Sequence, residues 1–574
     1  MCGIAGIIGE NAKSNTIDNM LTVQHHRGPD YTGRWLESGI ALGHNRLSII
    51  DLSNSANQPF FDKTKRYVIV FNGEIYNYIE LKEKLKSSYE FQTAGDTEVL
   101  LAAFIFWGKD CLKHLNGMFS FAIYDTKSKS LFAARDRFGV KPFFYHKSKN
   151  SFYFSSEIKA IHAAGIKKIP NEETWAGYFA YGSYGMPDET FWEKIYQLPG
   201  GHYLEFNNNT ISITKWYIFE EEIKKYSNKT SFDEVKEEYA DLMRNSIELR
   251  FRADVDVGFN ISGGLDSSAL LTFVNQMEGK ESINAYTFYT GHKDYDELYW
   301  VKEMINTTQN PLNKVLLTTD HFTREIDFLT HIQDEPCGGI PTVAYSKIFK
   351  EARKDGVIVL LDGQGMDEQW AGYDYYLKTN NQLIQGMKGS PLKKNVLSEV
   401  FLSKAKKPSY PTPFDDELLN KQYRDLFFTK IPRALRFNDR VSMAYSTELR
   451  EPFLDYRLVE LAFAQPYEYK IKKGIQKYLL REIVSEYLND SITNSPKRPL
   501  QTPQREWLGN ELSEYVESKI ENIKDGNFSW WFNVDELSKE WQKYKDGDND
   551  SSFHIWQWVS LSNLIYKYEY TQDS

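Results

Sequence analysis

Residues 260–268 read Asn-Ile-Ser-Gly-Gly-Leu-Asp-Ser-Ser, and this stretch decides the fold of the second half of the chain. An apolar run with the alternation of a strand (255–261) leads into it, and an apolar helical pattern (269–274) leads out. Gly263 and Gly264 mark a tight loop between the two. The free N–H groups of the helix start would then point at one spot, which favours a bound anion. The stretch therefore predicts a strand, a glycine loop and a helix built to hold phosphate groups.

The side chains of this loop narrow the kind of phosphate site. Ser262, Ser267 and Ser268 add hydroxyl donors, and Asp266 beside a polyphosphate makes chemical sense as a ligand of Mg²⁺. No Walker lysine follows the glycines, so the match to a kinase-type P-loop is poor. The string instead resembles the Ser-Gly-Gly-x-Asp-Ser loop of the ATP pyrophosphatases, which split ATP into AMP and pyrophosphate. A serine-capped glycine turn without function is the weaker alternative.

Composition bounds the class of protein. At 574 residues the chain is too long for one core and predicts two to four domains. It has no basic region followed by an apolar one at its start and no apolar run near the ~18 residues of a membrane helix. Three cysteines without CxxC spacing indicate a reducing cytoplasm, and a net charge of −10 argues against general nucleic-acid binding. We therefore expect a cytoplasmic protein with no membrane and no nucleic-acid partner.

The chain begins Met1-Cys2-Gly3, which places a cysteine where methionine removal would expose it. The α-amine of Cys2 would then have a pKa of ~7.7–8.0 and could act as the base for its own thiol. A thiol with a built-in base is the arrangement of an N-terminal nucleophile. On its own this start is weak evidence, because a cysteine at position two is usually incidental.

Four clusters downstream make the interpretation specific. They are His26–Asp30 (His-Arg-Gly-Pro-Asp), Gly43–Asp51 (Gly-His-Asn-Arg-Leu-Ser-Ile-Ile-Asp), Asn72–Asn77 (Asn-Gly-Glu-Ile-Tyr-Asn) and Gly95–Glu98 (Gly-Asp-Thr-Glu). With Cys2 they resemble the class II glutamine amidotransferase domain across roughly residues 1–200. The resemblance implies that Cys2 attacks the side-chain amide of glutamine.

The same resemblance assigns the groups that would hold the glutamine. The amide of Asn72 and the backbone N–H of Gly73 would form the oxyanion hole, because a developing oxyanion needs fixed donors. Arg46 would bind the α-carboxylate of glutamine, while Glu74 and Asp96 would bind its α-amino group. Taken alone, Asn72-Gly73 would be better explained as a hairpin turn.

Strand-like runs fill the rest of the first half, at 119–124, 131–135, 143–146 and 152–155. Many short strands with few helices predict two stacked antiparallel sheets flanked by helices. This is the α+β sandwich (αββα) of the N-terminal nucleophile hydrolases, and we expect it over residues 1–210. A segment rich in Asn, Lys and Glu, residues 205–230, is the best candidate for a domain junction.

In the second half, strands alternate with helices. Strand patterns at 255–261, 284–289, 313–318 and 356–362, separated by helical segments, predict an α/β doubly wound parallel sheet. We expect this ATP-pyrophosphatase domain over residues 225–560. Ligands of such sheets bind at the carboxyl ends of strands, and the phosphate loop lies at one of those ends.

A second loop follows the fourth predicted strand. It reads Asp362-Gly363-Gln364-Gly365-Met366-Asp367-Glu368, so Asp266 and Asp367 would meet at neighbouring strand ends and share a Mg²⁺. Further patches follow at 438–444, 448–455 and 474–482. Their order resembles the synthetase motifs of the glutamine-hydrolysing asparagine synthetase family, and the match spans about residues 2–510.

This resemblance implies an ATP site and a catalytic lysine. Lys477 would lie over the phosphates and stabilise charge as pyrophosphate leaves; without its flanking match, a solvated helical lysine would be as good an explanation. The residues placed at ATP by the match are Ile261, Ser262, Gly263, Gly264, Asp266, Ser267, Phe288, Asp362, Gly363, Asp439 and Arg440.

The chain departs from the family pattern at three places. Gln364 stands where the family usually has an acid, and an amide cannot take up a proton. We expect Gln364 to position the acceptor, and proton removal to fall to departing pyrophosphate, Glu448 or Asp362. The segment 334–341 lacks the arginine that binds aspartate in some members, and 496–503 reads Pro-Lys-Arg-Pro-Leu-Gln-Thr-Pro where a Gly-Phe is common.

The reaction implied is glutamine-dependent amide synthesis. Cys2 would release ammonia from glutamine, ATP with Mg²⁺ would adenylate a carboxylate, and ammonia would displace AMP. An internal passage is required because ammonia protonates in bulk water at pH 7. Aspartate, giving asparagine, is the leading acceptor. The alternatives are another carboxylate, such as a uronic acid on a sugar nucleotide, and a catalytically silent sensor of glutamine or nucleotide. The partners are small molecules, and a homodimer is left open.

Overall fold

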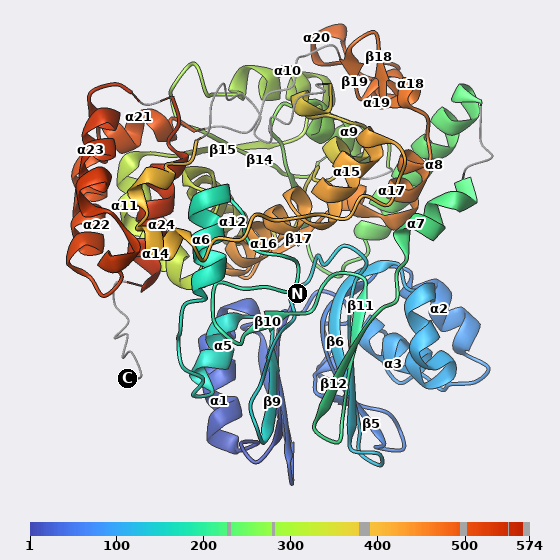
Figure 1. Cartoon of the computed structure of the whole chain (residues 1–574). Helices are drawn as coiled ribbons and strands as arrows, with labels where there is room; N and C mark the ends of the chain where they lie inside the picture. The colour runs from blue at the N-terminus through green and yellow to red at the C-terminus, as the bar shows by residue number, and fades with distance from the viewer. Residues whose placement is uncertain (227–230, 278–281, 378–390, 494–501, 549, 566–574) are drawn as a thin grey trace.

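The computed structural model describes residues 1–226, 231–277, 282–377, 391–493, 502–548 and 550–565. Two antiparallel sheets stand side by side in one half of the molecule, and a parallel sheet wrapped in helices forms the other half (Figure 1). The N-terminus lies where the two halves meet (Figure 1). Among the described residues, no helix combines the length and apolar character needed to cross a bilayer.

The first half contains two six-stranded sheets in which every neighbouring pair is antiparallel. In spatial order, the first sheet is β10 (Tyr196–Gln197), β8 (Phe144–Lys147), β9 (Ser151–Ser155), β1 (Gly3–Gly9), β3 (Ile40–Arg46) and β2 (Tyr31–Glu37). The second is β12 (Thr210–Lys215), β11 (His202–Asn207), β7 (Ser130–Arg135), β6 (Gly117–Asp125), β5 (Tyr67–Ile75) and β4 (Phe60–Phe61).

The two sheets are packed face to face with a helical layer on each outer side. Ile4, Leu42, Val70 and Ala122 belong to one buried cluster between the sheets. The outer layers are α1 (Ser14–Val23) with α5 (Ile158–Ala163) on the first sheet, and α2 (Tyr78–Leu85) with α3 (Asp96–Trp107) on the second. This layer order confirms the predicted αββα sandwich.

The second sheet extends into the segment expected to be a domain junction. Strands β11 and β12 form a hairpin there, and Asn208 and Asn209 at its tip have φ angles of 48° and 58°. Two residues with positive φ are what a two-residue hairpin turn requires, and asparagine tolerates that conformation. The Asn-rich composition of 205–215 therefore marks a turn rather than a linker.

The second half is built on five parallel strands. Their spatial order is β15 (Leu312–Leu316), β14 (Ala285–Tyr289), β13 (Val257–Asn260), β16 (Val359–Leu361) and β17 (Glu448–Arg450). One face packs on α8 (Phe232–Arg250), α9 (Leu265–Asn275), α10 (Leu298–Thr308) and α19 (Tyr478–Val484). The other packs on α11 (Thr319–Gln333), α12 (Ile340–Lys354) and α16 (Lys430–Met443). The predicted doubly wound sheet is confirmed, with β17 as a strand that the sequence did not indicate.

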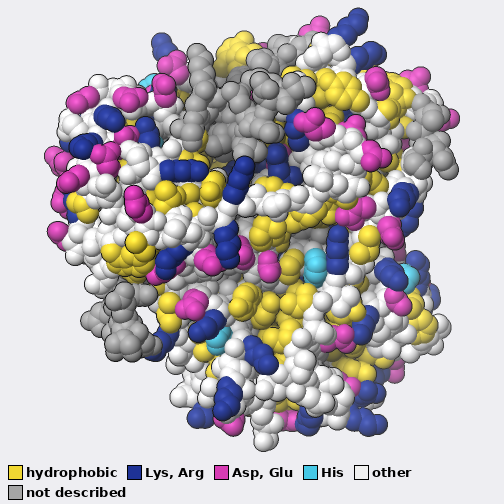
Figure 2. All heavy atoms as spheres, in the orientation of Figure 1, with side chains coloured by type: hydrophobic (Ala, Val, Ile, Leu, Met, Phe, Trp, Pro, Cys, Tyr) yellow, Lys and Arg dark blue, Asp and Glu magenta, His cyan; other side chains and the backbone are white. Residues whose placement is uncertain are grey.

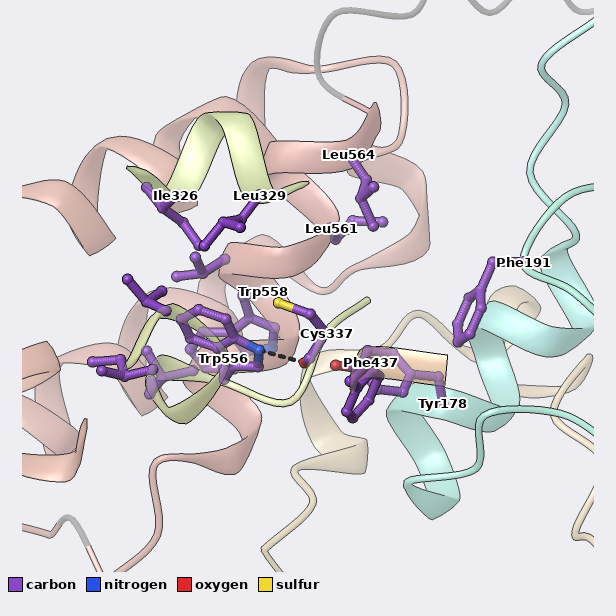
Figure 3. Packing of buried hydrophobic residues seen from close by; sticks show 14 of the residues in the cluster. Tyr178, Phe191, Ile326, Leu329, Cys337, Phe437, Trp556, Trp558, Leu561 and Leu564 are labelled. Atoms are coloured by element: carbon purple, nitrogen blue, oxygen red, sulfur yellow. Dashed lines mark hydrogen bonds between the residues drawn. The ribbon is translucent and has the colours of Figure 1, made fainter. Parts of the chain in front are cut away.

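The C-terminal helices complete one core with helices from both halves. Figure 3 shows Trp556 and Trp558 of α24 (Phe553–Ile565) packed near Ile326 and Leu329 of α11, with Tyr178 of α6 (Glu172–Tyr181) close by. The Trp556 indole Nε1–H donates to the Cys337 carbonyl at 2.8 Å. The other elements are α4 (Cys111–His114), α7 (Phe219–Glu222), α13 (Met366–Gln369), α14 (Glu399–Leu402), α15 (Glu417–Phe427), α17 (Tyr456–Phe463), α18 (Tyr467–Lys470), α20 (Asp490–Thr493), α21 (Gln504–Gly509), α22 (Ser513–Asp525), α23 (Val534–Lys545), β18 (Ile471–Lys472) and β19 (Ile475–Gln476).

Buried polar contacts join the two halves. The Arg27 guanidinium donates to Glu157 of its own half at 3.0 Å and to Asp439 of the other half at 2.9 Å. Across the same boundary, the Asn116 amide donates to Asp455 at 2.9 Å. Basic and acidic side chains are interspersed on the face shown in Figure 2, so this face has no large patch of one charge sign.

Candidate active sites

Cys2 lies at the start of β1, with its side chain buried at the boundary between the halves. Its N–H donates to the Asn72 side-chain oxygen at 2.9 Å, and Arg27 Nε donates to its carbonyl at 3.0 Å. Burial raises the pKa of the Cys2 thiol, so the thiol needs a base before it can attack. A neighbouring α-amine is the base that the N-terminal nucleophile hypothesis requires.

The predicted oxyanion donors Asn72 and Gly73 sit together on β5, beside Cys2. Asn72 is fully buried, and its Nδ2 has no hydrogen-bond partner in the described part of the chain. A side chain at Gly73 would place its Cβ 2.1 Å from the Met118 carbonyl oxygen, so only glycine fits there. An unsatisfied buried amide next to the thiol is what a donor waiting for an oxyanion would look like.

The predicted glutamine-binding residues converge on the same place. Arg46 donates to the Ser53 carbonyl at 2.8 Å, and Asp96 accepts the Ile75 N–H at 2.8 Å. Glu74 is buried and its Oε2 has no hydrogen-bond partner among the residues described. Glu74 therefore retains acceptor capacity for a ligand.

Electrostatics explain why this pocket favours an ammonium group. Burial, reinforced by the nearby Glu448 and Asp96, raises the pKa of Glu74 well above its usual value. Burial also raises the pKa of Asp96 to about 6. A bound cation would relieve the repulsion among these carboxylates and restore their charge.

The first residue of the chain reaches the other half of the molecule. The Met1 ammonium donates to Glu448 Oε2 at 2.8 Å, and Glu448 belongs to β17 of the parallel sheet. Burial alone would raise the pKa of Glu448, but the ammonium and Arg450 outweigh it and lower that pKa to about 2. The thiol site thus lies one residue away from a strand of the second sheet.

The phosphate loop forms as the sequence predicts. It connects β13 to α9, with Gly264 as the residue preceding the helix. The Ser262 N–H donates to Ser267 Oγ at 3.2 Å, and Ser267 Oγ donates to the Gly264 carbonyl at 3.1 Å. At Gly263, φ is +68°, a conformation that favours glycine.

Five of the residues predicted at ATP line one pocket of about 40 Å³ at the carboxyl edge of the sheet. They are Ile261, Ser262, Ser267, Phe288 and Asp362. Burial raises the pKa of Asp362 to about 6, against hydrogen bonds from Asn260 and Gly363. The pocket walls that the sequence did not indicate are Asn260, Tyr286, Thr287, Tyr295, Glu297, Tyr345 and Ile348.

Lys477 meets both acids predicted to bind the metal. Its Nζ lies 2.6 Å from an Asp266 oxygen and 2.7 Å from Asp367 Oδ1. Burial opposes its charge, but the two carboxylates outweigh burial and raise the pKa of Lys477. Loops from two strand ends thus bring the two acids together, as the sequence predicts, but on Lys477, and the shared Mg²⁺ stays a prediction. Gly363 packs against Ser267 beside them.

These two carboxylates suit Mg²⁺. The ion takes hard oxygen ligands and usually keeps waters and substrate phosphates with only one or two carboxylates. Over the described ranges, no cluster of three or more His, Cys, Asp or Glu side chains is placed to hold a metal by itself. The donor set therefore fits a metal that arrives with phosphates.

Asp439 and Arg440 lie elsewhere than predicted. Both belong to α16, where Asp439 binds Arg27 and Arg440 lies 3.0 Å from Glu335. Neither lines the pocket at the phosphate loop. Sequence order alone placed them at ATP, whereas the face of the helix turns them toward the boundary between the halves.

The third departure noted in the sequence falls largely outside the described residues. Residues 494–501 are not described, which leaves only Thr502 and Pro503 of the basic segment 496–503 within the structure. That part of the comparison with the family pattern therefore stays a prediction.

Comparison with known proteins matches each half of the chain to a family. A glutamine amidotransferase domain model matches residues 1–217, and an asparagine synthase model matches residues 238–566. Asparagine synthetase (glutamine-hydrolyzing) 3 of Bacillus subtilis is 31% identical over 565 residues, covering 92% of this chain and 91% of that protein. Asparagine synthetase (glutamine-hydrolyzing) 1 of the same organism is 28% identical, covering 91% and 90%. Amidase chry2 of Gibberella zeae is 25% identical, covering 98% and 97%.

Proposed function

This chain belongs to the glutamine-hydrolysing asparagine synthetase family, and we propose that aspartate is the carboxylate that it converts to an amide. The two matched domains make it a glutamine-dependent amidotransferase and an ATP-dependent amidoligase. The acceptor, the roles of single residues and the metal are the parts that we propose.

In the first site, Cys2 attacks the amide carbon of glutamine. The Asn72 amide and the Gly73 N–H bind the oxyanion, which the free Asn72 Nδ2 supports. Glu74 and Asp96 hold the α-ammonium group, and Arg46 holds the α-carboxylate. Ammonia leaves after proton transfer, and the thioester is hydrolysed to glutamate.

In the second site, the loop from Ser262 to Ser267 binds the phosphates of ATP, and the carboxylate of the acceptor attacks the α-phosphorus. Asp266 and Asp367 are the residues that would hold Mg²⁺, which when bound supplies neutralisation of phosphate charge. Lys477 stabilises the departing pyrophosphate. Gln364, one residue beyond Gly363, positions the acceptor.

The single observation that carries this function is the contact between the two sites. Arg450 of β17 lies 3.9 Å from Glu74 of the glutamine site, a contact that does not involve Met1, and β17 is hydrogen-bonded beside β16, whose end carries Asp362 of the nucleotide pocket. Such proximity suits transfer of ammonia inside the protein, because ammonia that escapes is protonated and loses its nucleophilic lone pair.

One feature of segment 334–341 supports an acceptor other than aspartate. The segment 334–341 has no arginine of its own, and the nearby Arg436 and Arg440 lie 3.7 Å and 3.0 Å from Glu335. Their charge is already engaged, which leaves the α-carboxylate of aspartate without an evident partner in this segment. A carboxylate other than aspartate, such as a uronic acid on a sugar nucleotide, is therefore the second candidate.

The test is a panel of carboxylates supplied with ATP, Mg²⁺ and ammonium chloride. With aspartate, the enzyme should release AMP and pyrophosphate and form asparagine. Glutamate is the control for chain length, and succinate is the control for the α-amino group. Release of pyrophosphate with a sugar acid but not with aspartate would replace the leading acceptor by the second. Release with none would leave the sensor as the explanation.

The variant Gln364→Ala tests whether this side chain contacts the acceptor. We expect a rise in the acceptor KM or a fall in kcat of roughly 10- to 100-fold, the loss of one or two polar contacts, with little change in the KM for ATP. A variant identical to wild type with its true acceptor would show that this loop does not touch the substrate.

The state of the cysteines is relevant to the cellular compartment of the protein. All three are buried and unpaired, which supports the proposal of a reducing cytoplasm. The homodimer stays a prediction.

A further inference from the structure

Amide formation leaves a proton to be removed. When ammonia attacks an acyl adenylate, the nitrogen lone pair forms the C–N bond and the C–O bond to AMP breaks. The nitrogen then carries one proton more than the amide, and AMP leaves with the electron pair. Gln364, in the loop beside the adenylate, offers an amide that cannot accept this proton. Another group must do so.

Glu451 stands at the point where that group is needed. It follows β17 directly, as Asp362 follows β16, and the Asp362 N–H donates to the Arg450 carbonyl at 3.0 Å. Both acids therefore lie at the carboxyl edge of neighbouring strands, where parallel sheets bind their ligands. The backbone N–H of Gln364 lowers the pKa of Glu451 against its burial, so the two residues are neighbours. The sequence patch 448–455 contains Glu451, but the sequence analysis assigned this residue no role.

The Glu451 carboxylate is buried yet has capacity left. The residue is 4% exposed, and its Oε2 has no hydrogen-bond partner in the described chain. It also takes part in no ion pair within 4.0 Å over the described ranges, although Lys141 and Arg250 act on it from further away. Buried carboxylates are normally satisfied, so an open oxygen in this position indicates a function.

A small cavity lies against Glu451 at the boundary of the halves. Its volume of about 20 Å³ is enough for one molecule the size of water or ammonia. Tyr76 and Met118 of the first half line it together with Arg250 and Glu451 of the second. Glu451 therefore faces the side from which ammonia would come, while its neighbour Asp362 faces the nucleotide pocket.

The two acids expected to take the proton are less suitable. Glu448 is fully buried and accepts from Arg450 Nε at 2.5 Å, a charged pair that remains after Met1 is removed and that a proton on Glu448 would disrupt. Asp362 lines the nucleotide pocket, where Asn260 and the Gly363 N–H lower its pKa against burial. Glu451 differs because burial, and then Asp362, raise its pKa well above the usual value, against Lys141 and Arg250. A carboxylate of higher pKa removes a proton more readily.

We propose that Glu451 is the general base of amide synthesis, and that it accepts the proton from the attacking ammonia nitrogen while AMP departs. The assignment rests on the proposed function only in that some carboxylate is adenylated; it does not depend on which one.

The test separates three partial reactions of the full-length enzyme. Glu451→Gln keeps the size of the side chain and removes the base. We expect glutamine hydrolysis, and pyrophosphate exchange into ATP with the acceptor, to stay within about twofold of wild type. Amide formed from ammonium chloride should fall by roughly 10²-fold or more, within the range of general-base catalysis. The amide formed per pyrophosphate released should fall with it.

The control and the pH profile distinguish a base from a structural acid. Glu460→Gln makes the same change at another buried glutamate of the boundary, which bonds Tyr217 at 2.8 Å, and should leave the amide yield per pyrophosphate unchanged. In a plot of kcat against pH, with the ammonia concentration expressed as free NH₃, the fall of kcat at acidic pH should disappear in Glu451→Gln. Asp362, Lys141, Arg250, Asp136 and Arg137 surround Glu451 in both enzymes, so their titration is common to the two profiles.

Moving the acid tests the geometry. In the Glu451→Gln background, Gln364→Glu returns a carboxylate to the adjacent position and should recover amide synthesis at least about tenfold. If Glu451→Gln fails to fold, seen as loss of glutamine hydrolysis, Glu451→Asp takes its place and should lower the amide yield about tenfold. An amide yield within twofold of wild type in the variant that folds would overturn the proposal. So would parallel loss of pyrophosphate exchange. Failure of aspartate alone would instead count against the proposed acceptor.

Discussion

The two active sites hold charge in opposite ways. Around Cys2, the acids Glu74 and Asp96 are buried with their pKa values raised, so burial and mutual repulsion disfavour their charged forms until a further cation enters. At the nucleotide site, Lys477 already lies between Asp266 and Asp367. On the proposed assignments, the first site would bind a small zwitterion without losing an ion pair, whereas the second would exchange the ion pair of Lys477 for a metal and phosphates. Before its substrate arrives, the first site limits its charge through raised carboxyl pKa values, whereas the second balances its charge through an internal ion pair.

Removing the nucleophile should give the largest effect and should be confined to the first site. For Cys2→Ala we expect glutamine-dependent amide synthesis to fall by roughly 10³-fold or more, because no other group can form the thioester. Synthesis from ammonium chloride should stay within about twofold, and Cys111→Ala is the control. Glutamine hydrolysis in pure Cys2→Ala protein would contradict the assignment. Intact-mass analysis should also show that active enzyme has lost Met1.

Removing one metal ligand should affect only the second site. Asp266→Asn or Asp367→Asn should lower AMP formation by roughly 10²- to 10³-fold. Each substitution removes an oxygen ligand for Mg²⁺ and one of the two negative charges paired with Lys477. Glutamine hydrolysis should remain, and Asp320→Asn on the exposed surface of α11 is the control. Near-normal turnover with an unchanged response to Mg²⁺ would show that the two acids do not share a metal.

Removing one oxyanion donor should have a smaller effect within the first site. We expect Asn72→Ala to lower kcat for glutamine hydrolysis by about 10²-fold, the usual result of losing one such donor. The KM for glutamine should change less, because the donor acts mainly in the transition state. Asn209→Ala in the exposed hairpin is the control, and a larger change in KM than in kcat would assign Asn72 to ground-state binding.

The smallest effect concerns the pH dependence of glutamine use. Because Asp96 has a pKa of about 6, it is mostly charged at pH 7 and mostly protonated at pH 5. A protonated Asp96 cannot pair with the α-ammonium, so kcat/KM for glutamine should fall about tenfold from pH 7 to pH 5. The unfolded carboxyl has its ordinary pKa of 3.8, so the same shift makes the folded state progressively less favoured as pH rises from 3.8 to about 6. Protonation of the Cys2 α-amine, with its pKa of ~7.7–8.0, lowers kcat/KM in both enzymes. Wild type should therefore lose about tenfold more than Asp96→Asn over this range, and equal losses would contradict the assignment.

The sequence predicts best where geometry is local. The residues from Ser262 to Ser267 contact one another within a few positions, so a short motif specifies their structure. The same holds for the run at Asn72 and Gly73, whose role depends on a single strand. Both layer architectures were also predictable, because strand and helix periods differ along the chain.

Prediction fails where the contact is distant or the element is short. The partner of Asp439 is Arg27, 412 residues away, and no local pattern records that separation. Strand β17 has only three residues, two of them charged, so it lacks the apolar run of a buried strand. Glu451 was missed for the same reason, because its position beside Gln364 follows from that unpredicted strand.

The contacts of Arg27 also decide whether the two halves can be used as separate parts. Its guanidinium is fully buried and binds Asp439 of one half while its Nε holds the carbonyl of Cys2 in the other. Cutting the chain between the halves would leave Arg27 with Glu157 alone and take Asp439 away from Arg27 on the other fragment. An excised first half would therefore expose the backbone support of its own nucleophile to water, and grafting it onto a foreign synthetase would require an acid in the place of Asp439.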